Sequence, residues 1–217
     1  YTLSLHDALP ISTFCPTYNS CMMKNYVDAM ADALVDVLKY SDSSVEWPDI
    51  DDLQYDEAIK PEWFYPALQS EGESELMAIL QYTQMAGLYD EEIGDLVLGV
   101  GLVEMKHFAN VRDVVIKLKG TIPQPLNTKK LELGKNAGEA LVISIKNEIL
   151  TIQFYESVKE KIASQSKSAK TILQMLDKLI ADESLHLKLF YQQLVKMKLT
   201  QGVESLKSTL TRYLKLD

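Results

Sequence analysis

The chain contains three histidines, and two of them follow a glutamate by three positions inside long apolar helical patterns. The two pairs are Glu104–His107 and Glu183–His186. An ionisable side chain on an apolar helix face carries a desolvation cost unless a partner compensates for it. Because residues three positions apart share one face of a helix, each pair places a carboxylate beside an imidazole. The pairs favour a fold in which two such helices face each other.

A second pattern repeats in the same order along the chain. Glu75 and Glu148 are each followed by a tyrosine seven positions later, at Tyr82 and Tyr155. The full order is Glu…Tyr, Glu-x-x-His, Glu…Tyr and Glu-x-x-His, so the second half of the chain repeats the first. A duplicated helical hairpin explains this order, with each copy supplying half of one site.

The spacing of apolar residues predicts four long helices. They cover residues 75–88, 91–119, 137–163 and 169–198. Ser74 is placed to cap the first helix, and Gly120 is placed to end the second. The stretch 121–133 contains Pro123 and Pro125 and is expected to be a long crossover. The predicted fold is therefore an all-α four-helix bundle, made of two helical hairpins with a long crossover between them.

Three further parts surround this bundle domain, which is expected to span residues 74–199. Residues 20–73 are predicted to form an N-terminal helix over 20–40 and then an irregular aromatic segment that packs on the bundle. Residues 200–217 are predicted to form a short C-terminal helix. Residues 1–19 are set apart, because their first part resembles translated sequencing-adapter sequence and has no basic region of a secretion signal. We expect this N-terminus to be foreign to the natural chain or disordered.

The formal net charge of −9 argues against a nucleic-acid partner, because the sequence offers no basic stripe to neutralise phosphates. It also argues against an anionic membrane surface, and no apolar run reaches the length of a membrane span. Cys15 and Cys21 lack the Cys-x-x-Cys spacing of a zinc or rubredoxin site. We interpret them as reduced thiols and expect a cytoplasmic protein.

The repeated acids and histidines predict a metal site. Four carboxylates in one helical core would repel each other, and a buried carboxylate without a partner would take up a proton. Two divalent cations would remove both problems. The six candidate ligands are the acids and imidazoles of the repeat: Glu75, Glu104, His107, Glu148, Glu183 and His186. Oxygen-rich ligation with one imidazole per metal favours two iron or two manganese ions over copper or structural zinc.

In the usual geometry of such a site, Glu104 and Glu183 would bridge the two metals. Glu75 and Glu148 would be terminal ligands, one on each metal, and each histidine would bind one metal. Open positions would remain for dioxygen or peroxide. Beyond ligation, Glu183 is a candidate acid–base group if it leaves its bridging position, and a metal-bound water is the alternative.

Other residues are candidates for supporting this site. Tyr82 and Tyr155 are predicted either to take part in the chemistry from outside the ligand set or to be ordinary core tyrosines. Asp182 is a candidate acceptor for His107 or His186, since histidine ligands usually donate their second ring N–H to such a group.

The segments 74–82, 103–108 and 181–187 together resemble the ferritin-like superfamily, most closely its rubrerythrin-like and manganese-catalase-like bacterial members. The resemblance implies a ferritin-like fold and the use of iron or manganese with dioxygen or peroxide, or the oxidation and storage of iron. Two features depart from rubrerythrins. Thr151 stands where a rubrerythrin would carry a further glutamate, and the Cys-x-x-Cys pairs of a rubredoxin domain do not occur in this sequence.

The expected function is that of a di-iron or di-manganese carboxylate protein reacting with peroxide or dioxygen, as a peroxidase-like or catalase-like oxidoreductase. Its electron donor would be an external partner that the sequence does not identify. An iron-handling or spore-coat-like structural protein, associated with spores in the latter case, is one alternative, and a bundle without metal is another. Since apolar bundles of this size often associate, we expect a homodimer or larger homo-oligomer.

Overall fold

The structure is a computed structural model that describes residues 37–69, 74–89, 91–123 and 131–214. These residues belong to one compact unit of the chain. Every regular element among them is a helix, which confirms the predicted all-α class. Most of the predicted helix over 20–40, both cysteines and part of the predicted crossover lie outside the described residues.

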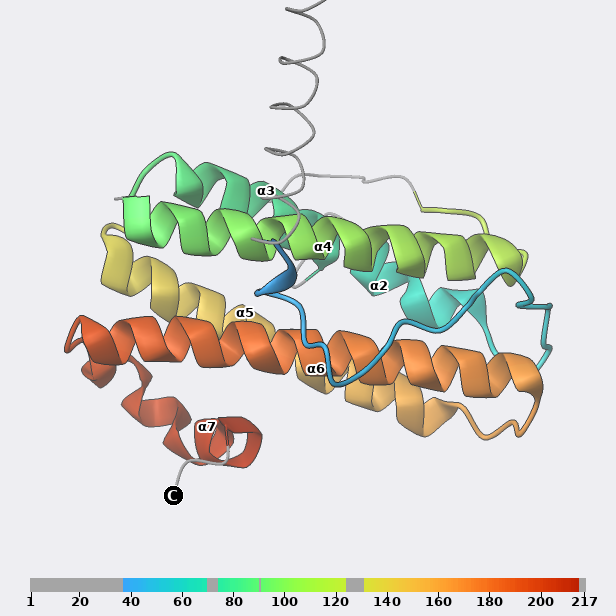
Figure 1. The fold of residues 1–217 in the computed structure, drawn as a ribbon. Coiled ribbons are helices and arrows are strands. Elements are labelled where there is room, and N and C mark those ends of the chain that lie inside the picture. Colours follow the sequence, from blue (N-terminus) through green and yellow to red (C-terminus); the bar gives the residue numbers. More distant parts are fainter. Residues whose placement is uncertain (1–36, 70–73, 90, 124–130, 215–217) are drawn as a thin grey trace, which may run out of the picture. The chain divides into compact units, whose positions relative to one another are not determined.

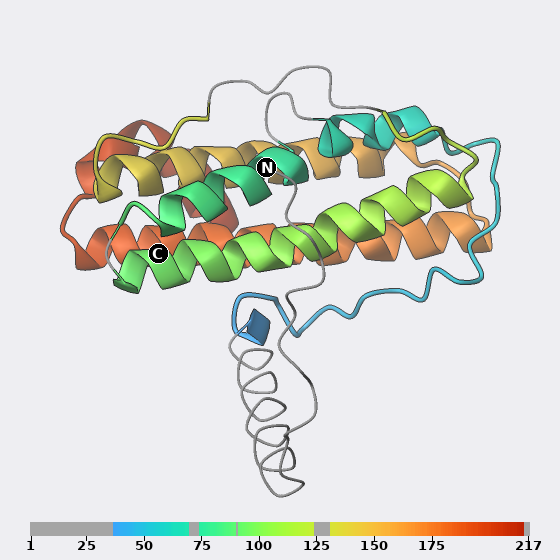
Figure 2. The same cartoon turned by 90° about the horizontal axis from the view of Figure 1, so that it is seen from above.

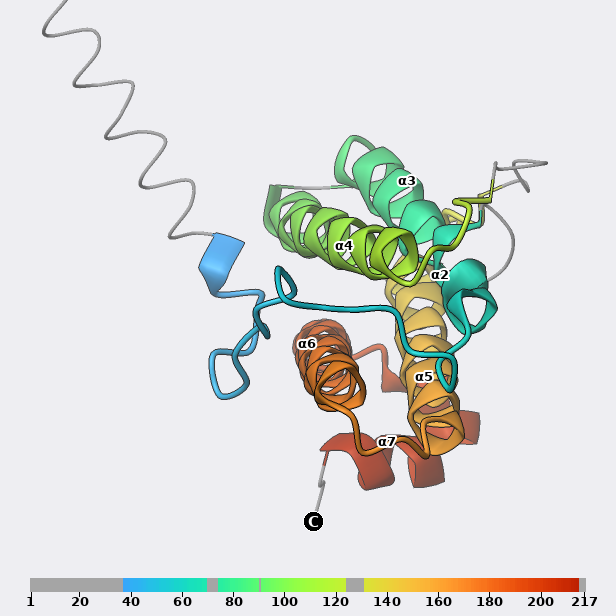
Figure 3. The same ribbon diagram turned by 90° about the vertical axis from the view of Figure 1, so that its right-hand side faces the viewer.

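Four long helices lie side by side and form the bundle (Figures 1 and 2). They are α3 (Glu75–Ala86), α4 (Glu91–Lys117), α5 (Ala137–Lys161) and α6 (Lys167–Lys196). The most extensive contacts join α3 to α4 and α5 to α6, which are the two predicted hairpins. The view along the helices in Figure 3 shows the four of them around a common centre. α4 has 27 residues and is about 40 Å long, so it extends beyond the middle of the bundle in both directions.

Side chains of the preceding residues cap three of these helices. The Ser74 hydroxyl accepts a hydrogen bond from the Met77 amide at the start of α3, as the sequence predicts. Asn136 and Ser166 cap α5 and α6 in the same way. These caps satisfy amide groups that the first turn leaves free, so they fix where each helix begins.

The end of α4 differs in detail from the prediction that Gly120 terminates it. The left-handed residue is Lys119, with a φ of 61°, and Gly120 follows it. The Gly120 amide donates to the Val115 carbonyl at 2.8 Å, and the Lys119 amide donates to Ile116 at 2.9 Å. This is a Schellman ending. Gly120 is needed because a β-carbon there would lie 2.6 Å from Pro61.

The buried apolar residues form two clusters that are separated by a polar level of the bundle. On α4, residues up to Val103 belong to one cluster, and residues from Val111 onward belong to the other. On α6 the change falls between Leu179 and Leu187. The repeated acids and histidines of both helices lie in these two gaps, so the folding core itself brings them to one level.

Residues 41–60 run along α6 as an extended segment (Figure 1) and lead into two short helices. These are the 3-10 helix η1 (Pro61–Phe64) and α2 (Tyr65–Leu68), which the prediction of an irregular segment missed. Phe64 is fully buried, and Trp47 and Trp63 pack against the second apolar cluster, as predicted for this aromatic segment.

The C-terminal part begins with a 3-10 helix, η2 (Thr200–Leu206), and continues as α7 (Lys207–Leu214). The C-terminal helix was expected within residues 200–217, and its α-helical part begins only at Lys207. No helix among the described residues is both long and apolar enough to cross a lipid bilayer.

Candidate metal centre

The structure brings all six predicted ligands to one level of the bundle. Each of the four long helices contributes: Glu75 from α3, Glu104 and His107 from α4, Glu148 from α5, and Glu183 and His186 from α6. All six side chains are at most 2% exposed. Their ligand atoms form two groups, each within 4.8 Å. The first group is Glu75, Glu104, His107 and Glu183, and the second is Glu104, Glu148, Glu183 and His186. Both groups include the two glutamates predicted to bridge.

His107 faces the first group with one ring nitrogen. Its Nδ1 lies 2.7 Å from a carboxylate oxygen of Glu104 and 3.1 Å from one of Glu183. A Glu75 oxygen lies slightly farther away, at 3.5 Å. The Nδ1 atom is therefore directed at three of the predicted ligands.

His186 has the corresponding position in the second group. Its Nδ1 lies 3.2 Å from Glu104 and 3.1 Å from Glu183. The rings of His107 and His186 are nearly parallel, with centroids 5.9 Å apart and an interplanar angle of 26°. The two imidazoles thus flank the same pair of carboxylates.

The opposite ring nitrogens of the histidines have different partners. Nε2 of His107 lies 3.1 Å from Oδ2 of Asp182, as the sequence suggested for one of the two histidines. Nε2 of His186 lies 2.9 Å from the backbone carbonyl oxygen of Tyr40. Both partners accept a hydrogen bond, so each ring carries a proton on Nε2. Nδ1 of each ring then faces the carboxylates, and it is the nitrogen that would bind a metal ion after giving up its proton.

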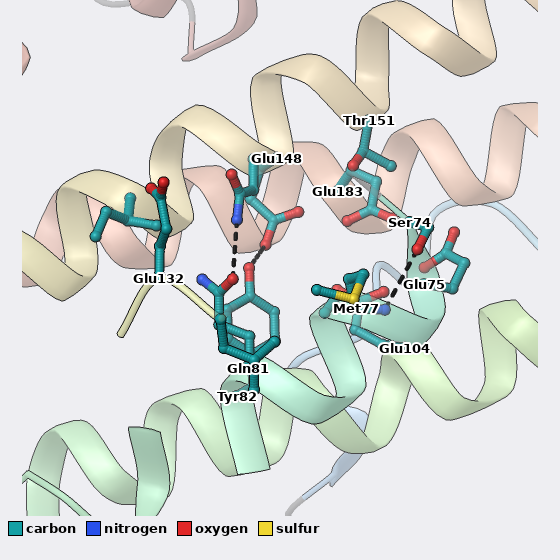
Figure 4. A pocket seen from close by; sticks show the side chains of 14 residues that line it. Ser74, Glu75, Met77, Gln81, Tyr82, Glu104, Glu132, Glu148, Thr151 and Glu183 are labelled. Carbon is teal, nitrogen blue, oxygen red and sulfur yellow. Dashed lines mark hydrogen bonds between the residues drawn. The ribbon is translucent and has the colours of Figure 1, made fainter. Parts of the chain in front are cut away.

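Each tyrosine of the repeat contacts the glutamate of the other half. The Tyr82 hydroxyl donates a hydrogen bond to Glu148 (Figure 4), and the Tyr155 hydroxyl donates to Glu75. Both tyrosines are nearly inaccessible to solvent. They therefore hold the two predicted terminal ligands from the side away from the histidines.

Burial and mutual charge shift the pKa values of these groups strongly. Burial lowers the histidine pKa values, but the facing carboxylates outweigh it, so the pKa of His107 rises well above its ordinary value and that of His186 rises to about 10. Burial raises the pKa of Glu104, but the charges of the two histidines outweigh it and hold that pKa low. For Glu75 and Glu148, burial and the repulsion of neighbouring carboxylates raise the pKa together.

The chemistry of the donor set fits a pair of metal ions. Both carboxylate oxygens of Glu104, Oε1 of Glu183 and Nδ1 of His107 are buried and have no hydrogen bond of acceptable geometry, although they lie close to one another. Buried carboxylate oxygens without donors are costly. Cations between them would satisfy all four atoms. Two imidazoles among four carboxylates match the ligand preference of iron or manganese.

A cavity of about 240 Å³ between α3 and α5 reaches this centre (Figure 4). It is bordered by all four candidate carboxylates and by Tyr82. Farther out it is lined by polar and apolar side chains, among them Gln81, Asn147, Thr151 and the exposed Glu132. A small molecule can therefore approach the carboxylates from the face opposite the histidines.

Sequence reasoning missed the residues that hold Asp182 and His186. Lys178 is only 3% exposed and lies 2.8 Å from Asp182, and its spacing of four positions on α6 was a usable signal. Ser41 also donates to Asp182. The Tyr40 carbonyl is a backbone group, and no side-chain pattern could reveal it.

No model of a protein family matches this sequence, and no curated protein matches it. Solved structures do match. Mycobacterium tuberculosis bacterioferritin, BfrA, aligns with a TM-score of 0.57 and 21% identity, over 67% of this chain and 89% of that chain. A second mycobacterial bacterioferritin aligns with a TM-score of 0.56 and 20% identity, over 71% and 91%. The fold of this chain is therefore the ferritin-like four-helix bundle with additional short helices.

Proposed function

We propose that this protein is a di-iron or di-manganese carboxylate protein that reacts with peroxide or dioxygen. The observation that carries the proposal is the buried set of four carboxylates and two imidazoles, in which both oxygens of Glu104, one oxygen of Glu183 and Nδ1 of His107 lack hydrogen bonds. Without a cation, two histidines would have to offset the desolvation of four buried carboxylates. The ferritin-like fold, which builds such sites between facing helices, supports the same reading.

The six residues would hold the metals in the two overlapping groups, with Glu104 and Glu183 shared between them. Bound iron or manganese would supply the change in oxidation state that reduction of peroxide or dioxygen requires. The reaction also consumes protons. Glu183 is the candidate for moving them, because it is shared between the groups and also borders the cavity.

Tyr82 and Tyr155 would keep the terminal glutamates in place during the reaction. Burial, and next the charge of the bonded glutamate, raise the pKa of each tyrosine well above its ordinary value. Both hydroxyls therefore keep their protons and remain hydrogen-bond donors. The cavity between α3 and α5 offers a small oxidant a way to the carboxylates, and reducing equivalents would come from an external donor.

Iron handling is the second candidate function. The specific observation in its favour is the similarity to two bacterioferritins, which extends over about nine-tenths of their length. An iron-handling protein would assemble into large particles and oxidise many ferrous ions per chain. A peroxide-reducing or dioxygen-reducing enzyme would instead turn over oxidant repeatedly with its own metals.

The first experiment is elemental analysis of protein produced with both iron and manganese available, followed by assays of peroxide and dioxygen consumption. We expect about two metal ions per chain. The variant Glu104→Ala should lose most of this metal and the oxidant turnover with it. Unchanged metal content and turnover in this variant would refute the proposal.

A matched control is Glu156→Ala on α5. Glu156 accepts hydrogen bonds from Arg212 and Tyr213 and lies outside both ligand groups. Its removal deletes a carboxylate from the bundle and should leave the metal content unchanged. Multi-hundred-kilodalton particles with ferrous oxidation far beyond the bound metal would favour iron handling instead.

A further inference from the structure

The two halves of the repeat differ at the position before the shared glutamate. Asp182 precedes Glu183 on α6, whereas Val103 precedes Glu104 on α4. Asp182 reaches the histidine of the other helix, His107. By the symmetry of the repeat, residue 103 would serve His186, but a valine cannot accept a hydrogen bond. One carboxylate is therefore missing from an otherwise duplicated arrangement.

Residues 40–42, called here the strap, fill this gap from outside the bundle. The Tyr40 carbonyl oxygen takes the place of the missing carboxylate and accepts from Nε2 of His186 at 2.9 Å. On the other side of the strap, the Ser41 hydroxyl and the Asp42 amide donate to Asp182 at 3.2 and 2.5 Å. The strap thus supplies the outer partner of His186 and contacts Asp182, the outer partner of His107.

Asp182 is fixed from several directions and is fully buried. Besides the two strap donors, the ammonium group of Lys178 lies 2.8 Å from Oδ1. Lys178 also donates to the Ser41 hydroxyl at 2.9 Å and to the Asp42 carbonyl. Oδ2 faces His107 and also lies 3.3 Å from the Ser41 hydroxyl. Burial raises the pKa of Asp182, but the contact with His107 and then the hydrogen bonds from Lys178 and the Asp42 amide outweigh it and lower that pKa.

These partners differ in charge, and the difference bears on metal affinity. A carboxylate that accepts the outer N–H of a histidine makes the other ring nitrogen a stronger metal ligand than a neutral carbonyl does, because it stabilises positive charge on the ring. His107 has the carboxylate and His186 has the carbonyl. The two ligand groups have the same composition, three glutamates and one histidine each, so the difference in charge between the two positions comes from these outer contacts.

We infer that Asp182, positioned by Lys178 and the strap, makes the two metal positions inequivalent, so that the position at His107 fills before the position at His186. This inference rests on the proposed metal centre and adds an order of loading to it. Asp182 acts through His107 and is a positioning residue, since it lies outside both ligand groups.

The test is an anaerobic titration of metal-free, full-length protein with Co²⁺, followed by calorimetry and by the visible spectrum of the bound ion. The unmodified protein should bind two ions in two separate steps. In Asp182→Asn, both histidines would have neutral carbonyl partners. Its first step should weaken by about 10-fold to 100-fold, and the two affinities should converge.

Three further variants assign the steps. His107→Ala should abolish the tight step, and His186→Ala should abolish the weak one. Asp177→Asn makes the same chemical change on the same helix at an exposed site paired with Lys159, and it should leave both steps unchanged. If Asp182→Asn does not fold, as judged by circular dichroism, Ser41→Ala removes one donor to Asp182 and should weaken the first step alone.

The outcomes separate the two claims. If the unmodified protein binds no Co²⁺, Fe²⁺ or Mn²⁺, the proposed function fails. If it binds two ions with equal affinity, or if Asp182→Asn weakens both steps equally, the metal centre stands and the inferred order of loading is wrong.

Discussion

The hydroxyl of Tyr155 on α5 donates a hydrogen bond to Glu75 on α3, across 80 positions of sequence. The matching bond joins Tyr82 to Glu148, so each half of the repeat supports the terminal glutamate of the other half. The two hairpins are therefore connected by polar contacts through the centre of the bundle as well as by apolar packing. A residue that touches neither histidine can thus affect both stability and metal binding.

Removal of one of these hydroxyls should lower both the unfolding free energy and the metal affinity of the protein. Tyr155→Phe leaves a buried oxygen of Glu75 without its donor, which costs about 1–3 kcal/mol of unfolding free energy. Metal affinity should fall by about 10-fold, because the ligand loses its orientation. Urea unfolding and metal titration measure the two effects. Tyr55→Phe, at a tyrosine 46% exposed to solvent, is the control and should change neither quantity.

Metal removal should destabilise the fold, because the proposed ions lie between the two apolar clusters. A ligand present at a hundred times its dissociation constant stabilises the folded state by about 2.7 kcal/mol per site. Chelation should therefore lower the melting temperature by several degrees, and added Fe²⁺ or Mn²⁺ should restore it. Scanning calorimetry before and after chelation gives the answer, and an unchanged melting temperature would mean that no metal had been holding the core.

The meeting of the six candidate ligands and the four long helices were predictable because side-chain periodicity encodes them. Glu104 and His107 interrupt an apolar stripe on α4, and Glu183 and His186 do the same on α6. A stripe faces the core, so the interruptions had to meet there. The match between residues 75 and 148 completed the set.

Features that depend on the backbone or on long-range contacts were not predictable. The Tyr40 carbonyl serves His186, but any residue type offers a carbonyl there. The left-handed residue at the end of α4 is Lys119, while Gly120 allows the close approach of Pro61. The crosswise pairing of tyrosines and glutamates follows from how the hairpins pack, whereas the seven-residue spacing shows only that they share a face.

The hydrogen bonds that Asp56 accepts at the surface should make the unfolding free energy depend on pH in the acidic range. Hydrogen bonds from the Ser166 hydroxyl and the Ala58 amide lower the pKa of Asp56 below its ordinary value of 3.8. A depressed pKa stabilises the folded state above the unfolded-state pKa, and this stabilisation is lost as the pH falls through the folded-state pKa. Asp56→Asn should thus be slightly less stable than the unmodified protein at pH 7, and the difference should vanish in strong acid. Urea unfolding at a series of pH values tests this, and a difference that grew toward acid would contradict it.

Gly99 on α4 should be intolerant of a side chain, because a β-carbon there would lie 2.0 Å from the ring of Tyr40. Tyr40 is only 8% exposed, so Gly99→Ala must displace its ring, at a cost of about 1–3 kcal/mol. Displacing Tyr40 also moves the carbonyl that holds His186, so metal binding at His186 should weaken more than binding at His107. Gly87→Ala, whose β-carbon would meet its nearest neighbour at 3.7 Å, is the control. Urea unfolding and Co²⁺ titration of both variants measure these effects, and equal behaviour of the two would show that Tyr40 does not couple α4 to the centre.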